Sequence, residues 1–364
     1  MNNNCRAYFR SALQLGLPVT QNEIIDGFTL KLGGRKYRFF GSTVPVNDGA
    51  STLVCSDKFV TNRVLRQMGV PCPKASFLDS ADFDYHTLYE AVRNLKFPLV
   101  VKPQNWSSLG CDVNCNIPNF TVLYDLCQHL FKWYPSLSFE EFHPNLNGYR
   151  VLVHQNKILE VIERFPSTVV GDGKLTIERL VEKENRKRRK TKSFLEPILQ
   201  DFEFEQALFE QKLNLWSVPE EGQKVVLGYT CNASRGGTIK TYTSGMCSEN
   251  KKMFINIAKE FNLSLAGIDV HCVSLHVPIR EGNGVVLEVN YNPSVRIHEE
   301  GLGGTTTQVT KIVMRSFIYK HPLSYALHAM RTPQLKSYFF KVFGGFAVLL
   351  ALSIFIIGNF LGMI

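Results

Sequence analysis

The sequence lacks the features that mark several classes of protein. Its nine cysteines form no C-x₂-C pair, and Cys111 and Cys115 have no second pair to complete a zinc site. The first ten residues, MNNNCRAYFR, have no apolar core and do not read as a secretory signal peptide. Scattered cysteines without an export signal indicate a reduced compartment, so this part of the chain is predicted to be cytosolic.

Signs of covalent catalysis by a side chain are also missing. No Ser-His-Asp or Cys-His arrangement stands out, and the sequence has neither an internal repeat nor a low-complexity segment. With 364 residues, the chain is long enough for two domains, or one large one, with a substantial core. The informative residues must therefore be sought among polar side chains at the ends of predicted elements.

The segment 342–364, VFGGFAVLLALSIFIIGNFLGMI, contains no charged side chain. As a helix rising about 1.5 Å per residue, it is long enough to cross a hydrocarbon core of roughly 30 Å. A buried core helix is the alternative, but an apolar surface on every side favours a transmembrane helix. Because Arg331, Lys336 and Lys341 precede it, the positive-inside rule predicts a single-pass membrane protein with a cytoplasmic N-terminal domain.

Positive charge exceeds negative charge, with a formal net charge of +9, and it is unevenly spread. A dense basic run, ENRKRRKTK, occupies 184–192. Such a run is commonly a solvated loop, although it can also attract anionic lipid or contact nucleic-acid phosphates. It has no interleaved aromatic residues that would stack on bases, so nucleic acid is not expected as a partner.

Two polar residues lie in the strand-like segment GVVLEVNYNP. Alternation along a strand predicts Val286, Glu288 and Asn290 on one face, with Leu287 and Val289 facing a core. A carboxylate beside a carboxamide is an oxygen-donor pair suited to Mg²⁺ held against phosphates. Two solvated residues on an edge strand would give the same pattern, so the pair becomes informative only in the company of other residues.

Further polar residues stand at the ends of predicted elements. Lys58 opens a helix in SDKFVTNRVLRQMGV, with Ser56 as the expected N-cap. Lys102 ends the buried strand FPLVVKP, and Asp269 lies in the strand LAGIDV. Two lysines and three oxygen ligands are what binding of a nucleoside triphosphate with Mg²⁺ requires.

The predicted strands and helices alternate irregularly, which indicates an α+β protein. Residues 1–55 read as a small β-rich segment of short strands and turns, with FTLKL and KYRFF forming a hairpin around Gly33-Gly34.

The most specific segment is 148–189, GYRVLVHQNKILEVIERFPSTVVGDGKLTIERLVEKENRKRR. CNASRGGT, LAGIDV and LEVNYNP follow it in order. This series resembles the ATP-grasp superfamily of carboxylate–amine ligases, and most of all the ATP-grasp domains of cyanophycin synthetases and bifunctional glutathione synthetases. The resemblance covers roughly Ser56 to Gly304. Its motif residues are Arg150, Arg164, Pro166, Gly171-Asp172-Gly173, Thr176-Ile177 and Asn185.

The resemblance implies an ATP-grasp fold, in which two α+β subdomains clasp ATP. With the segments predicted above, the domains are a β-rich segment at 1–55, the ATP-grasp domain at 56–322, a basic juxtamembrane segment at 323–341 and the transmembrane helix at 342–364. The implied cofactors are ATP and Mg²⁺, with two ions bound and Mn²⁺ as an alternative. ATP would be bound by Lys58, Lys102, Gly110, Glu140, Glu141, Phe142 and His143, and the metal by Asp269, Glu288 and Asn290.

The chemistry implied is formation of an amide from a small-molecule carboxylate and an amine, such as an amino acid or short peptide, through an acyl phosphate. Arg150, Arg164 and Arg296 are the candidates for gripping the carboxylate or acyl phosphate, because guanidinium offers a planar fork of donors. The residues expected to bind substrate are Asn185, Asn232, Gly236 and Gly237. The favoured interpretation of the basic run is then a loop near the substrate. The resemblance also leaves a homodimer open.

One motif departs from the family. The phosphate loop usually ends in G-x-G-V, but here Asp112 replaces the second glycine in Gly110-Cys111-Asp112-Val113. Glycine permits close backbone approach to phosphate, whereas a carboxylate repels it. The alternative function is therefore a catalytically degenerate ATP-binding scaffold that recruits partners at the membrane.

Overall fold

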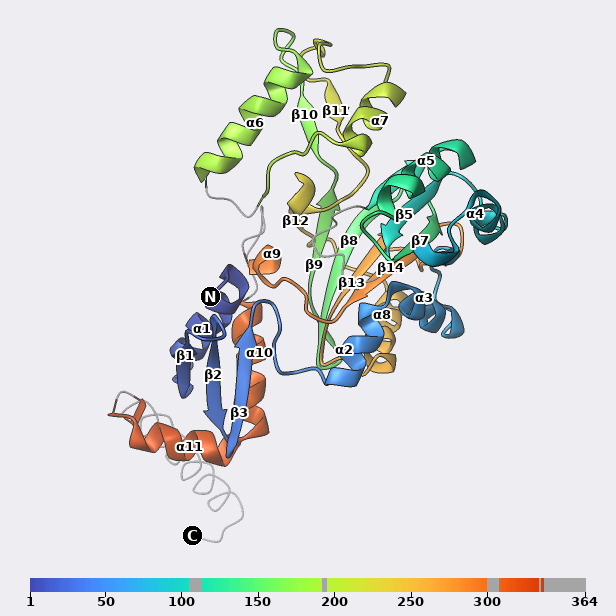
Figure 1. Ribbon diagram of the computed structural model, residues 1–364. Coiled ribbons are helices and arrows are strands. Elements are labelled where there is room, and N and C mark those ends of the chain that lie inside the picture. The colour runs from blue at the N-terminus through green and yellow to red at the C-terminus, as the bar shows by residue number, and fades with distance from the viewer. Residues whose placement is uncertain (105–112, 192–194, 300–307, 334, 337–364) are drawn as a thin grey trace, which may run out of the picture. The chain divides into compact units, whose positions relative to one another are not determined.

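The computed structural model describes residues 1–104, 113–191, 195–299, 308–333 and 335–336 (Figure 1). The chain divides into two compact units. Unit 1 joins residues 1–45 to the chain from 308 onward, and unit 2 comprises residues 46–307. This division differs from the predicted domains, because it ends the N-terminal segment at 45 and groups that segment with residues after 307.

Unit 1 is built on a three-stranded antiparallel sheet of β1 (Val19–Asn22), β2 (Gly27–Leu32) and β3 (Arg35–Phe40). The predicted hairpin is confirmed, with Leu32 opposite Arg35 across the turn. Gly33 and Gly34 both have positive φ, which a two-residue hairpin turn of this kind requires. On the buried face of the sheet, the rings of Phe28 and Phe39 stack with their centroids 4.2 Å apart.

In the described part of unit 1 the sheet is accompanied by three helices, namely α1 (Asn3–Gln14), α10 (Val309–Lys320) and α11 (Pro322–Arg331). Helix α1 was not predicted, since this segment was expected to consist of strands and turns. The Asn2 side chain caps α1 by accepting from the Cys5 amide at 2.9 Å. Ser11 on α1 bonds to Thr310 on α10 at 2.7 Å, a contact between residues 299 positions apart that no local pattern reveals.

Unit 2 begins with α2 (Gly49–Ser56) and α3 (Lys58–Gln67). The N-cap of α3 is Asp57 rather than Ser56, because the Asp57 carboxylate accepts from the amides of Phe59 and Val60 at 2.9 Å each. Next comes a four-stranded antiparallel sheet in the order β4 (Ala75–Asp79), β7 (Ser136–Glu141), β5 (Leu99–Pro103), β6 (Asn114–Ile117). Its apolar side chains share a core with α4 (Tyr85–Val92) and α5 (Phe120–Leu130). Phe83, which directly follows η1 (Ser80–Asp82), packs against the same core.

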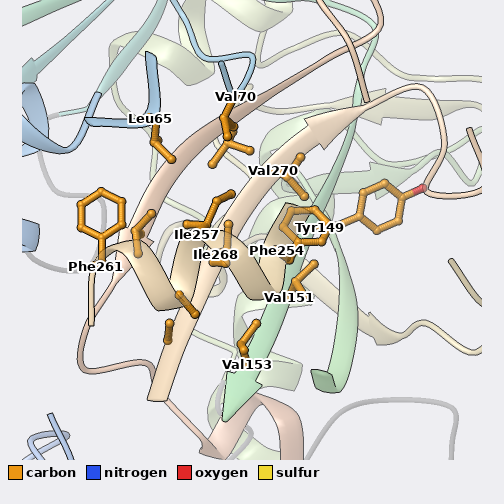
Figure 2. Packing of buried hydrophobic residues seen from close by; sticks show 14 of the residues in the cluster. Leu65, Val70, Tyr149, Val151, Val153, Phe254, Ile257, Phe261, Ile268 and Val270 are labelled. Carbon is orange, nitrogen blue, oxygen red and sulfur yellow. The ribbon is translucent and has the colours of Figure 1, made fainter. Parts of the chain in front are cut away.

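The central sheet of unit 2 has five antiparallel strands, in the order β12 (Thr238–Thr241), β9 (Lys157–Phe165), β8 (Asn147–His154), β13 (Leu265–Cys272), β14 (Gly284–Asn290). Helix α8 (Ser248–Glu260) covers one face together with α3. Figure 2 shows Phe254 and Ile257 of α8 against Val151, Ile268 and Val270 of the sheet. This face is apolar, so polar side chains gather on the other face.

A β-bulge in β14 corrects the predicted faces of that strand. Asp269 pairs with Glu288, but Val270 pairs with Val286, so Leu287 is the extra residue. Val286 therefore turns into the core beside Val289, each no more than 1 % exposed, and does not share a face with Glu288. Strict alternation fails here because a bulge shifts the register by one residue.

The remaining part of unit 2 contains a two-stranded sheet, β10 (Thr168–Val170) and β11 (Lys224–Val226), with α6 (Ile177–Thr191) and α7 (Phe202–Glu210). The shorter elements η2 (Ala233–Arg235) and α9 (Arg296–Glu299) follow later in the chain. The basic run was expected to be a loop, but through residue 191 it belongs to α6. Its helical form follows from the apolar positions Ile177, Leu180 and Val181, which anchor α6 in the local core.

Within the ranges described, no helix is long and apolar enough to span a membrane. The predicted transmembrane segment 342–364 lies outside the described residues, as do Gly110 and Asp112 of the predicted phosphate loop.

Candidate functional site

Arg150, Asp269 and Glu288 form a row across the polar face of the central sheet. Asp269 lies opposite Arg150 of β8 and opposite Glu288 of β14, and opposed residues share a face. Arg150 donates to both carboxylate oxygens of Asp269, with Nε–Oδ1 at 2.6 Å and Nη2–Oδ2 at 2.7 Å. Arg164 of β9 adds a third bond, Nη1–Oδ2 at 2.9 Å.

This cluster is nearly closed to solvent. The side chains of Arg150, Arg164 and Asp269 are only 10–12 % exposed. Burial opposes ionisation of Asp269, but the two guanidinium groups outweigh it and hold the pKa of this carboxyl well below its usual range. Asp269 is therefore a fixed negative charge that orients both arginines, a role that the sequence did not suggest.

Lys58 of α3 and Lys102 of β5 stand close in sequence to two residues that are joined by a hydrogen bond. Asp57, which caps α3, accepts from Gln104 Nε2 at 3.2 Å, and Gln104 directly follows β5. Burial lowers the pKa of Lys58, Glu288 opposes that shift, and the charge of Lys102 adds to it. Both lysines and the row of charged residues therefore belong to one electrostatic cluster.

Lys102 also carries an ion pair with Glu140 at the end of β7. Its Nζ lies 2.6 Å from Glu140 Oε1, and both side chains are less than a tenth exposed. This pair fixes the lysine at the junction of the two neighbouring strands. A phosphate that approaches Lys102 would compete with the Glu140 carboxylate for the ammonium group.

The predicted adenine hinge, residues 140–143, leaves β7 at this point. Glu141 accepts from the Lys96 amide at 3.0 Å, so its carboxylate holds the preceding loop. The Phe142 ring meets Tyr229 edge to face, with centroids 5.7 Å apart. Burial lowers the pKa of His143, and its Nε2 is buried without a hydrogen-bond partner among the described residues. The adenine-binding role of this segment stays a prediction.

The four residues expected to bind substrate meet around one packed turn, with Asn185 reaching it from α6. Asn185 uses both ends of its carboxamide on Ile198, with Nδ2–O at 3.1 Å and N–Oδ1 at 2.7 Å. Asn232 caps η2, and Gly236 ends it at φ +85°. A Cβ on Gly236 would lie 2.6 Å from Ile198 Cα, and one on Gly237 would lie 2.6 Å from the Phe165 carbonyl oxygen. Both glycines are therefore required by the close approach of other backbone.

Arg188 completes this turn and was not singled out from the sequence, where it counted only as part of a basic loop near the substrate. It is 5 % exposed and donates to the carbonyl oxygens of Glu196 at 2.9 Å and Gly236 at 2.8 Å. The helical spacing Ile177, Val181, Glu184 and Arg188 was the available signal, because it places Arg188 on the inward stripe of α6.

Two other polar residues, one buried and one half-buried, had no clear signal in the sequence. Glu203 of α7 is 2 % exposed and accepts from the Cys115 amide at 3.0 Å and from Thr230 Oγ1 at 2.8 Å. His271 stands two residues after Asp269, over Gly148. Burial, with the charge of Arg164, lowers the pKa of His271 to about 4, so the ring is neutral at physiological pH.

The oxygens of Glu288 and Asn290 suit Mg²⁺, whereas both carboxylate oxygens of Asp269 already accept hydrogen bonds from Arg150 and Arg164. Asn290 donates from Nδ2 to the Gly267 carbonyl at 3.2 Å, which fixes the carboxamide through its nitrogen and spares the oxygen that a cation needs. No group of three or more His, Cys, Asp or Glu side chains able to hold a metal occurs in the described part of the chain. The predicted set has only two carboxylates, so bound phosphates or water would have to complete the coordination. Arg296 is the first residue of α9 and is half-buried.

The chain is similar to known proteins in sequence and in structure. A cyanophycin synthetase from Synechocystis sp. is 32 % identical over 253 residues, which are 68 % of this chain and 28 % of that protein. The glutathione biosynthesis bifunctional protein GshAB of Clostridium perfringens is 25 % identical over 299 residues, 79 % of this chain and 37 % of that protein. A bifunctional glutathione synthetase from Pasteurella multocida matches in structure with a TM-score of 0.60 at 21 % identity, over 88 % of this chain and 44 % of that one.

The chain has the ATP-grasp fold. The resemblance read from the motifs is thereby confirmed, and the polar cluster lies on the central sheet of the ATP-grasp region. No family model matches the sequence. The chain spans about a third of the length of the two relatives compared in sequence, so what those proteins do as a whole bears on this chain only as a proposal.

Proposed function

We propose that the protein is an ATP-dependent carboxylate–amine ligase that forms an amide through an acyl phosphate. The observation that carries this proposal is the row of Arg150, Asp269 and Glu288, joined by Arg164, on one face of the central sheet of an ATP-grasp fold. Two lysines from neighbouring elements, the half-buried Lys58 of α3 and the buried Lys102 of β5, belong to the same electrostatic cluster. A substrate carboxylate oxygen would attack the γ-phosphorus with loss of ADP. An amine would then attack the acyl carbon, and phosphate would leave.

The side chains of this site act by positioning and by charge. Lys58 and Lys102 would neutralise phosphate oxygens, and Arg150 and Arg164 would hold the carboxylate and the acyl phosphate that forms from it. Asp269 keeps both guanidinium groups in place before substrate arrives, which lowers the cost of reorganisation during phosphoryl transfer. Asn185, Asn232, Gly236 and Gly237 would shape the substrate side through the turn that Arg188 supports.

Mg²⁺ would be held by Glu288 and Asn290, with Asp269 as the third predicted ligand, and when bound it would offset the negative charge of the ATP phosphates. Binding of two ions, or of Mn²⁺, belongs to the same proposal. An amino acid or short peptide as substrate is supported by the names of the relatives, which are a cyanophycin synthetase and a glutathione-synthesising protein. A homodimer stays a prediction.

We further propose that residues 342–364 anchor the protein in a membrane, with the ATP-grasp unit on the cytoplasmic side. The support is the uncharged sequence of this segment and the basic residues before it. Resistance of the full chain to extraction with alkaline carbonate is the expected result. Complete release into the supernatant would contradict the anchor.

Turnover is tested with the full chain, ATP, Mg²⁺ and pools of amino acids, by phosphate release and mass spectrometry of the products. Release that depends on an amino acid is expected. Glu288→Gln should lower the rate about a hundredfold or more, whereas Glu260→Gln, on the exposed end of α8, should not change it. ATP binding without release in any pool would favour the scaffold alternative, for which Asp112 in the phosphate loop is the specific support.

A further inference from the structure

The net positive charge of the chain resides in unit 1. The sequence of unit 1 contains 12 Lys and Arg against 2 Asp and Glu, a net charge of +10. Unit 2 contains 29 Lys and Arg against 30 Asp and Glu, a net charge of −1. Residues 301–364 include no acidic side chain at all. The part of the chain that leads into the proposed anchor is thus strongly and uniformly basic.

The β2–β3 hairpin concentrates part of this charge. Lys31 and Lys36 lie directly opposite each other across the two strands, and both are exposed. Like charges in opposed positions destabilise a sheet, so this pair has a cost that a bound anion would remove. Arg35 is exposed at the same end of the hairpin, beside the Gly33-Gly34 turn.

Helix α11 lies across that end of the hairpin (Figure 1). His321 at its N-terminus bonds to Tyr37 of β3 at 2.6 Å, and a Cβ on Gly33 would overlap the His321 ring. Tyr325 donates to the Leu15 carbonyl at 2.7 Å, and Ala329 is 2 % exposed. These contacts fix which side of α11 turns inward.

The outward side of α11 is an apolar stripe. Leu323, Leu327 and Met330 follow one another at helical spacing and are 79 %, 52 % and 41 % exposed. Lys320 and Arg331 flank the helix, and both are exposed. An apolar stripe bordered by cations is the pattern of a helix that lies in a membrane interface.

From these observations we propose that unit 1 docks on an anionic phospholipid bilayer through the α11 stripe and the basic end of the hairpin. The stripe would enter the headgroup layer, and Lys31, Arg35 and Lys36 would contact lipid phosphates. The surface is continuous in sequence with the proposed anchor, on which this inference rests, because the uncharged segment begins 11 residues after α11 ends.

The test uses the full chain in nanodiscs of phosphatidylcholine alone and of phosphatidylcholine mixed with phosphatidylserine, followed by amide hydrogen exchange. Amides of α11 and of the hairpin should exchange more slowly in the discs that contain phosphatidylserine. Lys31→Gln with Lys36→Gln should weaken docking about 25-fold, at about fivefold for each neutralised residue. This double substitution should also remove most of the difference in amide exchange between the two kinds of disc. The matched control is Lys251→Gln with Lys252→Gln, at two exposed positions on α8 of unit 2. This control should leave the difference in amide exchange between the two kinds of disc unchanged.

The outcomes separate docking from anchoring. Equal exchange of α11 in both kinds of disc would overturn the docking surface while leaving the anchor intact. Protection of α11 that rises with protein concentration in detergent would also overturn it, since a second copy would then cover the stripe. If the chain does not enter nanodiscs, the anchor fails, and flotation with preformed vesicles of the same two compositions decides docking by itself.

Discussion

Replacing Asp269 with asparagine would test whether this carboxylate organises the candidate site. The substitution keeps the shape of the side chain and removes its charge. Arg150 and Arg164, each about a tenth exposed, would then lose the counter-ion that they share at 2.6–2.9 Å. Breaking a buried ion pair by removing one partner costs about 3–5 kcal/mol. We expect Asp269→Asn to lower the free energy of unfolding by an amount in this range.

The pH dependence of that loss follows from the direction of the pKa shift. The pKa of Asp269 is lower in the folded state than in the unfolded chain, so its contribution is complete above the ordinary Asp value of about 3.9. It disappears only as the pH falls through the folded pKa. The difference in stability between the natural protein and Asp269→Asn should therefore stay constant from about pH 5 to 8 and narrow below about pH 4.

Chemical denaturation of the full chain, followed by circular dichroism at several pH values, measures both effects. Asp125→Asn on α5 is a matched control, since Asp125 is exposed and the change should stay within about 0.5 kcal/mol. A loss smaller than about 1 kcal/mol at neutral pH would refute the reasoning, because the arginines would then have another adequate counter-ion. A difference that titrates between pH 6 and 8 would equally contradict it.

Two predictions concern the turn at Gly236. Arg188→Met should lower the free energy of unfolding by about 2–3 kcal/mol, because the carbonyls of Glu196 and Gly236 lose a charged donor. Arg189→Met, on the exposed side of α6, is the control and should change it by less than about 0.5 kcal/mol. Similar thermal unfolding of the two variants would contradict the role of Arg188. Gly236→Ala should cost at least about 1 kcal/mol more than Gly245→Ala. Both glycines have positive φ, but only at Gly236 would the new Cβ meet backbone, and equal losses by the same assay would contradict the crowding at Ile198.

Local patterns predicted those parts of the fold that local physics determines. The Gly33-Gly34 hairpin follows from turn residues and alternation within a few positions. Helix α1 was missed although its sequence carries local helix signals, since Asn2 caps it and the buried residues Cys5, Tyr8 and Ala12 recur at helical spacing. Its packing on α10 depends on contacts between residues far apart in sequence, which no local window contains.

The site was predictable as a set of residues but less so as an arrangement. Motif order brought together Arg150, Arg164, Asp269 and Glu288, and the structure places these four side by side. Motif order did not show that both arginines bind the carboxylate of Asp269, because this sharing depends on strand register. The bulge at Leu287, which aligns Glu288 with Asp269, likewise arises from pairing between strands and has no signature within β14 alone.

The distribution of charge explains why the basic run was a poor guide to partners. Cations of α6 have carboxylates one turn away, with Arg179 2.9 Å from Glu182 and Arg188 3.0 Å from Glu184. Such spacing is typical of a helix that balances its own charge, and unit 2 as a whole is nearly neutral. In unit 1, by contrast, Lys31 faces Lys36. Basic residues are densest in the sequence of α6, whereas basic residues without a carboxylate ion-pair partner among the described residues lie opposite each other in the hairpin. Because long-range attraction depends on net charge rather than on the number of cations, attraction to an anionic bilayer should come mainly from unit 1.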